Sequence, residues 1–194
     1  MNEPSSERAR LADALRRFDP AWLHNYQALS ERVAELCGRI EEQCREHLQC
    51  REGCDGCCRH LDLFWVEAVA LAWAFRQLDP DRAAFIRRQA ESTAAGGPCP
   101  LLAAGRCLLY AARPLICRTH GLPLLLEAAG QRRVDYCPLN FQQADGLPPG
   151  ALIHLETLNT TLAAVNALFV KELFGAACPP RARLSIAEAL RLPW

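Results

Sequence analysis

Four cysteines lie within nine residues, in the run Cys50-Arg-Glu-Gly-Cys54-Asp-Gly-Cys57-Cys58, and this run limits the chain's fold more than any other feature. Packing does not require so many thiols, and each one exposes the protein to oxidation. Metal or cluster ligation explains the run better, because thiolates must converge and glycines let a short loop fold tightly around them. The run therefore predicts a metal site in a loop.

The whole chain holds eleven cysteines in 194 residues. Its first residues, MNEPSSERARLADALRRF, lack the continuous apolar stretch of a secretory signal, so we expect a cytoplasmic protein with reduced thiols. Structural disulfides are the alternative. They fit less well, because a disulfide between the neighbours Cys57 and Cys58 closes a strained ring.

The charge balance bears on partners. The 22 basic and 22 acidic residues cancel, which removes the usual electrostatic reason to expect nucleic acid or an anionic membrane surface. No window approaches the roughly 20 apolar residues that span a bilayer. We expect neither nucleic acid nor membrane as a partner, and a protein redox partner or client instead. The oligomeric state is left open.

A second group of cysteines follows downstream. Cys99 and Cys137 each precede a proline, as at the end of bacterial ferredoxin ligand runs. Cys107 and Cys117 belong to the element Cys107-x2-Tyr110-x2-Arg113-Pro114-x2-Cys117-Arg118. With the first run, these residues form two groups of four cysteines.

Two arginines of this element are candidate cofactor-binding residues. A site of four thiolates carries negative charge, which Arg113 or Arg118 could neutralise or hydrogen-bond. The alternative is two solvated side chains. Tyr110 either hydrogen-bonds a sulfur or covers a small core with its hydroxyl outward.

The flanking sequence predicts a mainly α-helical single domain around a cysteine-rich loop region. Residues 1–49 should form N-terminal helices, 50–141 the metal-binding region and 151–194 the C-terminal helices. The expected helices are residues 7–18, 21–48, 64–78, 80–96, 155–174 and a short one beginning at the capping box of Ser185 and Glu188. Two short hairpins should turn at Gly105 and Gly130.

Several single residues have two interpretations each. Glu67 lies among apolar neighbours and should occupy the polar edge of its helix, unless it is buried with a partner. Cys37 and Cys44 are seven residues apart on one helix and should pack in the core. His60 and His120 follow cysteines closely, yet most such histidines are structural.

The segment from about Cys50 to Cys137 resembles the YkgJ-type cysteine-cluster proteins, whose domain is described as zinc- or iron-chelating. The resemblance rests on the first cysteine run, the Cys-Pro-Leu hairpin and the Cys-x2-Tyr-x2-Arg-Pro-x2-Cys-Arg element. It implies metal ligation by eight cysteines, namely Cys50, Cys54, Cys57, Cys58, Cys99, Cys107, Cys117 and Cys137. Cys37, Cys44 and Cys178 fall outside the pattern. The resemblance does not supply an activity, so the catalytic residues are unknown and the protein is not assigned as an enzyme.

Four thiolates satisfy either tetrahedral zinc or a [4Fe–4S] cluster. The cysteine-proline pairs and uneven spacings favour an iron–sulfur cluster over the paired C-x2-C units typical of zinc, with zinc as the alternative. The spacing Cys50-x3-Cys54-x2-Cys57 also occurs in radical S-adenosylmethionine enzymes. Those enzymes need alternating strands and helices after the motif, which this chain lacks. We therefore predict an iron–sulfur protein with a redox or accessory role, or else a zinc-binding structural or metal-delivery protein.

Overall fold

The computed structural model describes residues 3–51, 53–94, 96–128, 130–177 and 179–194, and it is mainly helical as predicted. The α-helices are α1 (Glu3–Arg16), α2 (His24–Gln43), α3 (Trp65–Arg76), α4 (Pro80–Ser92), α5 (Leu115–Thr119), α6 (Leu155–Phe174) and α7 (Ile186–Ala189). The 3-10 helices are η1 (Pro20–Leu23), η2 (Arg45–His47) and η3 (Tyr110–Ala112). The strands are β1 (Asp62–Leu63), β2 (Leu102–Ala103), β3 (Arg106–Cys107), β4 (Leu124–Ala128), β5 (Gln131–Asp135), β6 (Ile153–His154) and β7 (Leu184–Ser185). Cys178 lies outside the described residues.

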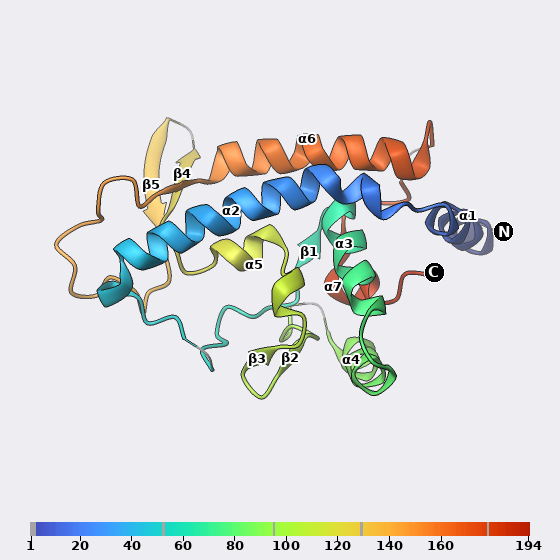
Figure 1. The fold of residues 1–194 in the computed structure, drawn as a ribbon, viewed down its shortest axis with the longest axis horizontal. Helices are drawn as coiled ribbons and strands as arrows, with labels where there is room; N and C mark the ends of the chain where they lie inside the picture. Colours follow the sequence, from blue (N-terminus) through green and yellow to red (C-terminus); the bar gives the residue numbers. More distant parts are fainter. Residues whose placement is uncertain (1–2, 52, 95, 129, 178) are drawn as a thin grey trace.

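The two longest helices form the main layer. Helices α2 and α6 run side by side, and α5 and α3 lie on the other side of α2 (Figure 1). Tyr26, Val33 and Ile40 of α2 are buried, which confirms the predicted apolar stripe. Cys37 and Cys44 of the same region are also buried, as expected for core residues.

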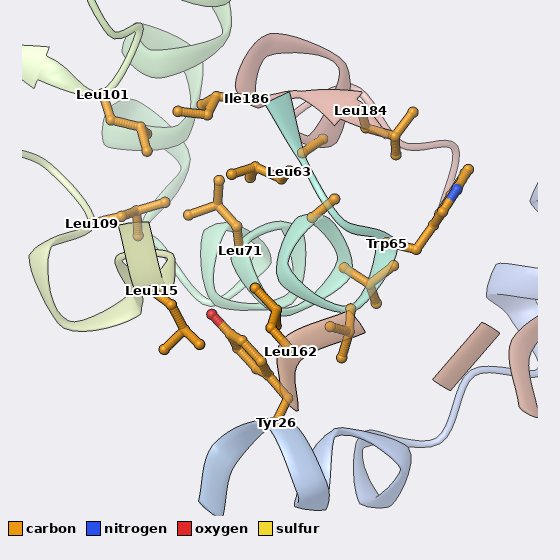
Figure 2. Packing of buried hydrophobic residues seen from close by; sticks show 14 of the residues in the cluster. Tyr26, Leu63, Trp65, Leu71, Leu101, Leu109, Leu115, Leu162, Leu184 and Ile186 are labelled. Carbon is orange, nitrogen blue, oxygen red and sulfur yellow. The ribbon is translucent and has the colours of Figure 1, made fainter. Parts of the chain in front are cut away.

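Helix α3 is the centre of the core. It is apolar on every face, because neighbours surround it, and Trp65, Val66 and Leu71 are fully buried. Figure 2 shows residues of distant segments, Tyr26 and Ile186 among them, packed around this helix. Truncation of one such buried leucine to alanine generally costs about 2–5 kcal/mol. The region that carries the cysteines is therefore attached to a well-packed helical body.

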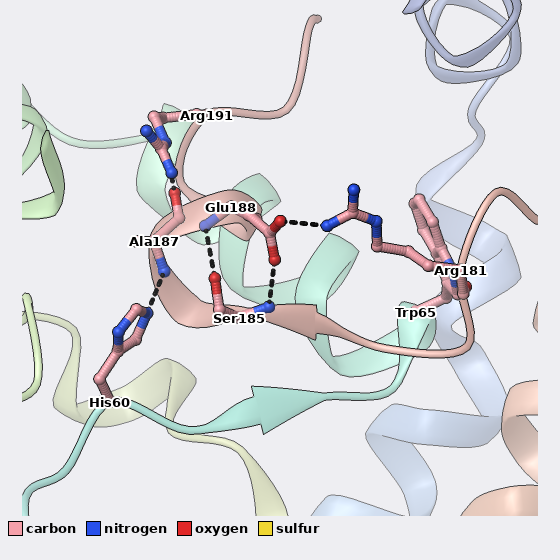
Figure 3. Close-up of polar contacts among 7 residues, drawn as sticks. All are labelled: His60, Trp65, Arg181, Ser185, Ala187, Glu188 and Arg191. Carbon is pink, nitrogen blue, oxygen red and sulfur yellow. Dashed lines mark hydrogen bonds and ion pairs between the residues drawn. The ribbon is translucent and has the colours of Figure 1, made fainter. Parts of the chain in front are cut away.

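The C-terminal segment folds back over α3 through a strand pair that the sequence did not predict. Strands β1 and β7 are antiparallel, and α7 follows β7 directly. Figure 3 shows the predicted capping box, in which Glu188 accepts a hydrogen bond from the backbone N–H of Ser185 at 2.8 Å and also pairs with Arg181. In return, the Ser185 hydroxyl accepts one from the Glu188 N–H at 3.2 Å.

Both predicted hairpins are present. Strands β2 and β3 pair around Ala104 and Gly105, which have positive φ values of 49° and 74°. Strands β4 and β5 pair antiparallel over five positions, with Gly130 at φ 76° beside the turn. Strand β6 adds to β4 in parallel, which was not predicted, and leads directly into α6.

Several helix boundaries differ from the prediction, and α3 is shorter at both ends than the expected 64–78. The helix expected over residues 21–48 is divided into η1, α2 and η2, because both ends of the segment adopt the tighter 3-10 geometry. The helix after Asp79 begins as predicted, with the Asp79 side chain accepting from the Arg82 N–H at 2.9 Å. It ends at Ser92 rather than at Gly96, because Thr93 turns to extended backbone and its hydroxyl donates to the Gln89 carbonyl. The first helix ends at Arg16 rather than at Phe18.

The described part of the chain contains no helix with the length and apolar character needed to span a bilayer.

Candidate metal centre

One cavity of about 1050 Å³ brings the two cysteine groups together. Seven of the eight candidate cysteines line it: Cys50, Cys54, Cys57, Cys58, Cys99, Cys107 and Cys117. Cys137 lies nearby, at the start of the turn that follows β5. Each described candidate cysteine is a free thiol. Within the described ranges, no three His, Cys, Asp or Glu side chains are grouped closely enough to hold one metal ion.

The first cysteine run has little regular structure of its own. Its described residues are held by short turns, in which the Cys54 N–H donates to Arg51 O and the Cys58 N–H donates to Asp55 O. The tip of the β2–β3 hairpin packs on this loop, since a Cβ at Gly105 would lie 3.1 Å from Gly53 Cα. The loop is thus placed by contacts with the second motif.

Cys58 and the hairpin cysteines form the buried side of the cavity. The Cys99 N–H donates to Cys58 O at 3.1 Å, and Arg59 and Pro98 form a bridge beside this contact. The Leu102 N–H donates to Cys99 O at 3.0 Å, and Leu102 faces Cys107 in the hairpin. These backbone contacts hold Cys58, Cys99 and Cys107 together.

Cys117 completes this side from helix α5. Burial raises the pKa of the Cys117 thiol to about 12, and Cys99, Cys107 and Cys58 add to the increase through charge repulsion. Burial likewise raises the pKa of Cys99 to about 11, with a further contribution from Cys107 and Cys58. The four sulfurs are therefore within electrostatic reach of one another.

Cys50 and Cys137 meet on the other side, around Asn140. The Asn140 side-chain nitrogen donates to Cys50 Sγ at 3.4 Å and to Gly121 O at 2.8 Å. The side-chain oxygen of Asn140 accepts a hydrogen bond from the Gln49 N–H at 2.8 Å. The backbone N–H of Asn140 donates to Cys137 O at 2.9 Å. The sequence did not single out Asn140 or Gly121. A polar side chain three residues after a candidate ligand was the available signal.

Cys54 and Cys57 line the same cavity as Cys50. Burial raises the pKa of Cys57, followed by repulsion from Cys58, and Cys50 and Cys54 add to the increase. Cys50 and Cys57 are exposed to solvent, while Cys54 is half-buried. This side of the cavity is therefore the more accessible one.

The cavity wall is rich in positive charge. Six arginines line it, against two carboxylates, Glu41 and Glu42; the arginines are Arg45, Arg51, Arg59, Arg106, Arg113 and Arg118. Burial raises the pKa of Cys107, while the charges of Arg113 and Arg82 act in the opposite direction.

The two arginines proposed as cofactor-binding residues, Arg113 and Arg118, are fixed by their own segment. Arg118 donates to Arg113 O at 2.9 Å and to Ala111 O at 2.7 Å. The Arg113 guanidinium carbon lies 3.5 Å from the ring centre of Tyr110, whose side chain is 63% exposed. Both arginines line the cavity and are held in place by these contacts. Their contact with a cofactor stays a prediction.

Glu67 is buried, and the expectation that it lies at a polar edge was wrong. Only 3% of its surface is exposed, and its carboxylate accepts from the Leu115 N–H at 3.0 Å and from the Phe64 N–H at 3.3 Å. Its partners are backbone N–H groups, which residue types do not identify. Leu115 begins α5, the helix that carries Cys117, so Glu67 fixes this ligand segment against α3.

The two neighbouring histidines differ in position. Nδ1 of His60 lies 3.2 Å from Ala94 O. Nε2 of His60 accepts a hydrogen bond from the Ala187 N–H at 3.2 Å (Figure 3). His60 therefore joins three segments and has a structural position. His120 lines the cavity, and burial lowers its pKa.

Comparison with known families agrees with this site. Residues 49–138 match the model of the family CxxCxxCC, described as a "putative zinc- or iron-chelating domain". This segment is similar to the CxxCxxCC family. The family name spells two residues between its first cysteines, whereas this CxxCxxCC domain has three between Cys50 and Cys54. No curated protein and no solved structure matches the chain.

The match confirms the resemblance drawn from the motifs and supports metal binding, with iron or zinc as the metal. The donor set of the CxxCxxCC domain fits both metals, because free thiols lining a basic cavity are soft ligands that iron–sulfur clusters and zinc each accept. The individual ligand assignments stay predictions.

Replacement of Gly121 by alanine tests how closely the Cys50 side is packed. Gly121 has φ 88°, and an added Cβ would lie 2.8 Å from Cys50 Sγ. We expect the backbone strain to cost about 1–2 kcal/mol of unfolding free energy. We also expect the metal content of the purified protein to fall, because the added Cβ displaces the sulfur.

Gly130→Ala is the matched control. Gly130 has φ 76°, and an added Cβ meets nothing within 4 Å. Urea unfolding should show a comparable backbone cost for the control, with unchanged metal content. Equal metal contents in the two variants would contradict the packing argument.

Proposed function

We propose that the chain is an iron–sulfur protein that holds [4Fe–4S] through its clustered cysteines and has a redox or accessory role. The observation that carries the proposal is the cavity of about 1050 Å³ lined by seven cysteines. A single tetrahedral zinc at about 2.3 Å from each sulfur draws four thiolates to within about 3.8 Å of one another. A cavity of this volume has room for a cluster with its own sulfides.

The cysteines and arginines have distinct parts in this proposal. When bound, an iron–sulfur cluster supplies one-electron chemistry. The cysteines hold it, and the arginine-rich wall offsets its negative charge. Stabilising the more negative, reduced form raises a cluster's reduction potential.

The accessible side of the cavity supports a role with a protein partner. Cys50 and Cys57 are exposed. Tyr110 in the cavity wall exposes 63% of its surface, and Leu139, which lines a second pocket with Cys54, exposes 51%. An apolar contact surrounded by arginines suits an acidic protein surface. We propose a redox partner or client of this kind, in the cytoplasm, where thiols stay reduced.

Zinc is the second candidate, because the family description names it and four thiolates satisfy it fully. In that case the metal would hold the loops in place, or the protein would deliver metal, without catalysis.

Anaerobic purification separates the two. We expect a coloured protein with iron and acid-labile sulfide in roughly equal amounts, whose visible absorption is bleached by a strong reductant. A colourless protein that contains zinc and no sulfide would overturn the iron–sulfur proposal and support the second candidate.

A further inference from the structure

Consecutive residues Cys57 and Cys58 differ in exposure. Cys57 is exposed to solvent like Cys50, whereas Cys58 is half-buried like Cys99, Cys107 and Cys117. After burial, Cys58 raises the pKa of Cys57 most, and Cys50 and Cys54 add to the increase. After burial, the largest influence on the pKa of Cys58 is Cys107, and Cys54 contributes less. Cys58 in turn raises the pKa values of Cys99 and Cys117. Cys58 also contacts Cys57 itself, so these two residues lie where two thiol groups meet.

The backbone supports this division independently of charge. The hydrogen bond from the Cys99 N–H to Cys58 O and the bridge between Arg59 and Pro98 attach Cys58 to the hairpin. Leu102 links Cys99 to Cys107 through the backbone. Its N–H donates to the Cys99 carbonyl, and it pairs with Cys107 in the β2–β3 hairpin. Cys58 is therefore structurally part of the hairpin group.

Cys137 belongs to the second group in the sequence but lies beside Cys50 of the first group in the structure. A Cβ placed on Gly121 would lie 2.8 Å from Cys50 Sγ and 3.7 Å from Cys137 Cβ, so the two cysteines flank the same glycine. Asn140 contacts both of them, through the Cys50 sulfur and the Cys137 carbonyl. The Cys137 N–H also donates to Gly121 O at 3.4 Å.

We propose that the eight cysteines form two separate four-thiolate centres whose membership crosses the sequence groups. The inner centre is Cys58, Cys99, Cys107 and Cys117, and the outer centre is Cys50, Cys54, Cys57 and Cys137. Each takes a [4Fe–4S] cluster, an identification that rests on the proposed function. All four ligands of the inner centre are half-buried, whereas the outer centre opens to solvent through its exposed members Cys50 and Cys57.

Paired alanine substitutions test the membership. Two substitutions in one centre should remove no more metal than one, whereas substitutions in different centres should remove all of it. Cys58→Ala/Cys99→Ala should therefore keep about half of the wild-type iron, roughly four of eight atoms per chain. Cys99→Ala/Cys137→Ala should keep about none. Grouping by sequence predicts the reverse for both pairs, and that result would overturn the proposal.

Cys37→Ala is the matched control, since Cys37 is a buried cysteine of α2 outside both centres. It should keep the full metal content. A wild-type protein with only one centre's worth of metal would also overturn the two-centre arrangement.

Stepwise metal release from the wild-type protein gives the same answer without variants that risk misfolding. A chelator added gradually should expose the outer cysteines first, so that an alkylating reagent modifies Cys50, Cys54, Cys57 and Cys137 together. The four inner cysteines should stay protected at that stage. Mixed labelling of both sets in parallel would overturn the proposal. If the metal is zinc, the iron–sulfur proposal fails. The membership is still tested, because the paired variants should then keep half or none of the wild-type zinc and the order of cysteine labelling should be the same.

Discussion

Removal of the bound metal is expected to lower the thermal unfolding midpoint by about 10 °C. A ligand that binds the folded state alone stabilises it by about 4 kcal/mol at a thousand times its dissociation constant. In a chain of this size, each kcal/mol shifts the midpoint by about 2–4 °C. The measurement is thermal unfolding followed by circular dichroism, before and after removal of the metal by a chelator.

The loss should be local at first. The described part of the 50–58 loop is held by short turns and by the backbone hydrogen bond from the Cys99 N–H to Cys58 O. Without metal, this loop therefore has few other restraints. Helices α2, α3 and α6 share the buried core and should keep their hydrogen-exchange protection. A chelator already saturated with metal is the control. If the metal leaves and the midpoint moves by less than about 2 °C, the metal does not support the fold.

Local signals explain which elements could be predicted from the sequence. Helix α6 begins and ends as predicted, because its apolar pattern is bounded by Gly175, whose φ of 64° ends the helix. Gly105 and Gly130 marked both hairpins for the same reason, since each has a positive φ. The capping box of Ser185 and Glu188 likewise marked the start of α7.

Elements that depend on distant contacts could not be predicted in this way. Strands β1 and β7 are two residues each, and their pairing joins segments that are far apart in the sequence. Neither strand has enough alternation to be recognised alone. The parallel contact of β6 with β4 is equally short.

The candidate site shows the same limit at the level of side chains. Sequence spacing identified eight cysteines, and seven of them line one cavity. Spacing alone placed Cys58 with Cys57, although its backbone pairs with Cys99. Which sulfurs share a centre depends on where the hairpin and α5 lie, and this is decided by tertiary contacts.

The contact of Glu67 with α5 leads to the second large effect. Glu67→Ala is expected to lower the unfolding free energy by about 3 kcal/mol, because it leaves the buried N–H groups of Leu115 and Phe64 without their acceptor and removes buried atoms. The variant should also bind less metal, since α5 is no longer fixed where it presents Cys117.

Glu188→Ala is the matched control for this prediction. Glu188 occupies the equivalent position at the start of α7 and accepts from the Ser185 N–H, but its side chain is 35% exposed and does not line the cysteine cavity. Its loss should cost about 1 kcal/mol, with full metal content, because water can satisfy the freed N–H group. Urea unfolding and metal analysis of both variants give the comparison. Glu67→Gln keeps one acceptor oxygen and should recover part of the lost unfolding free energy and part of the lost metal content. A Glu67→Ala variant with wild-type metal content would show that Cys117 is positioned without this carboxylate.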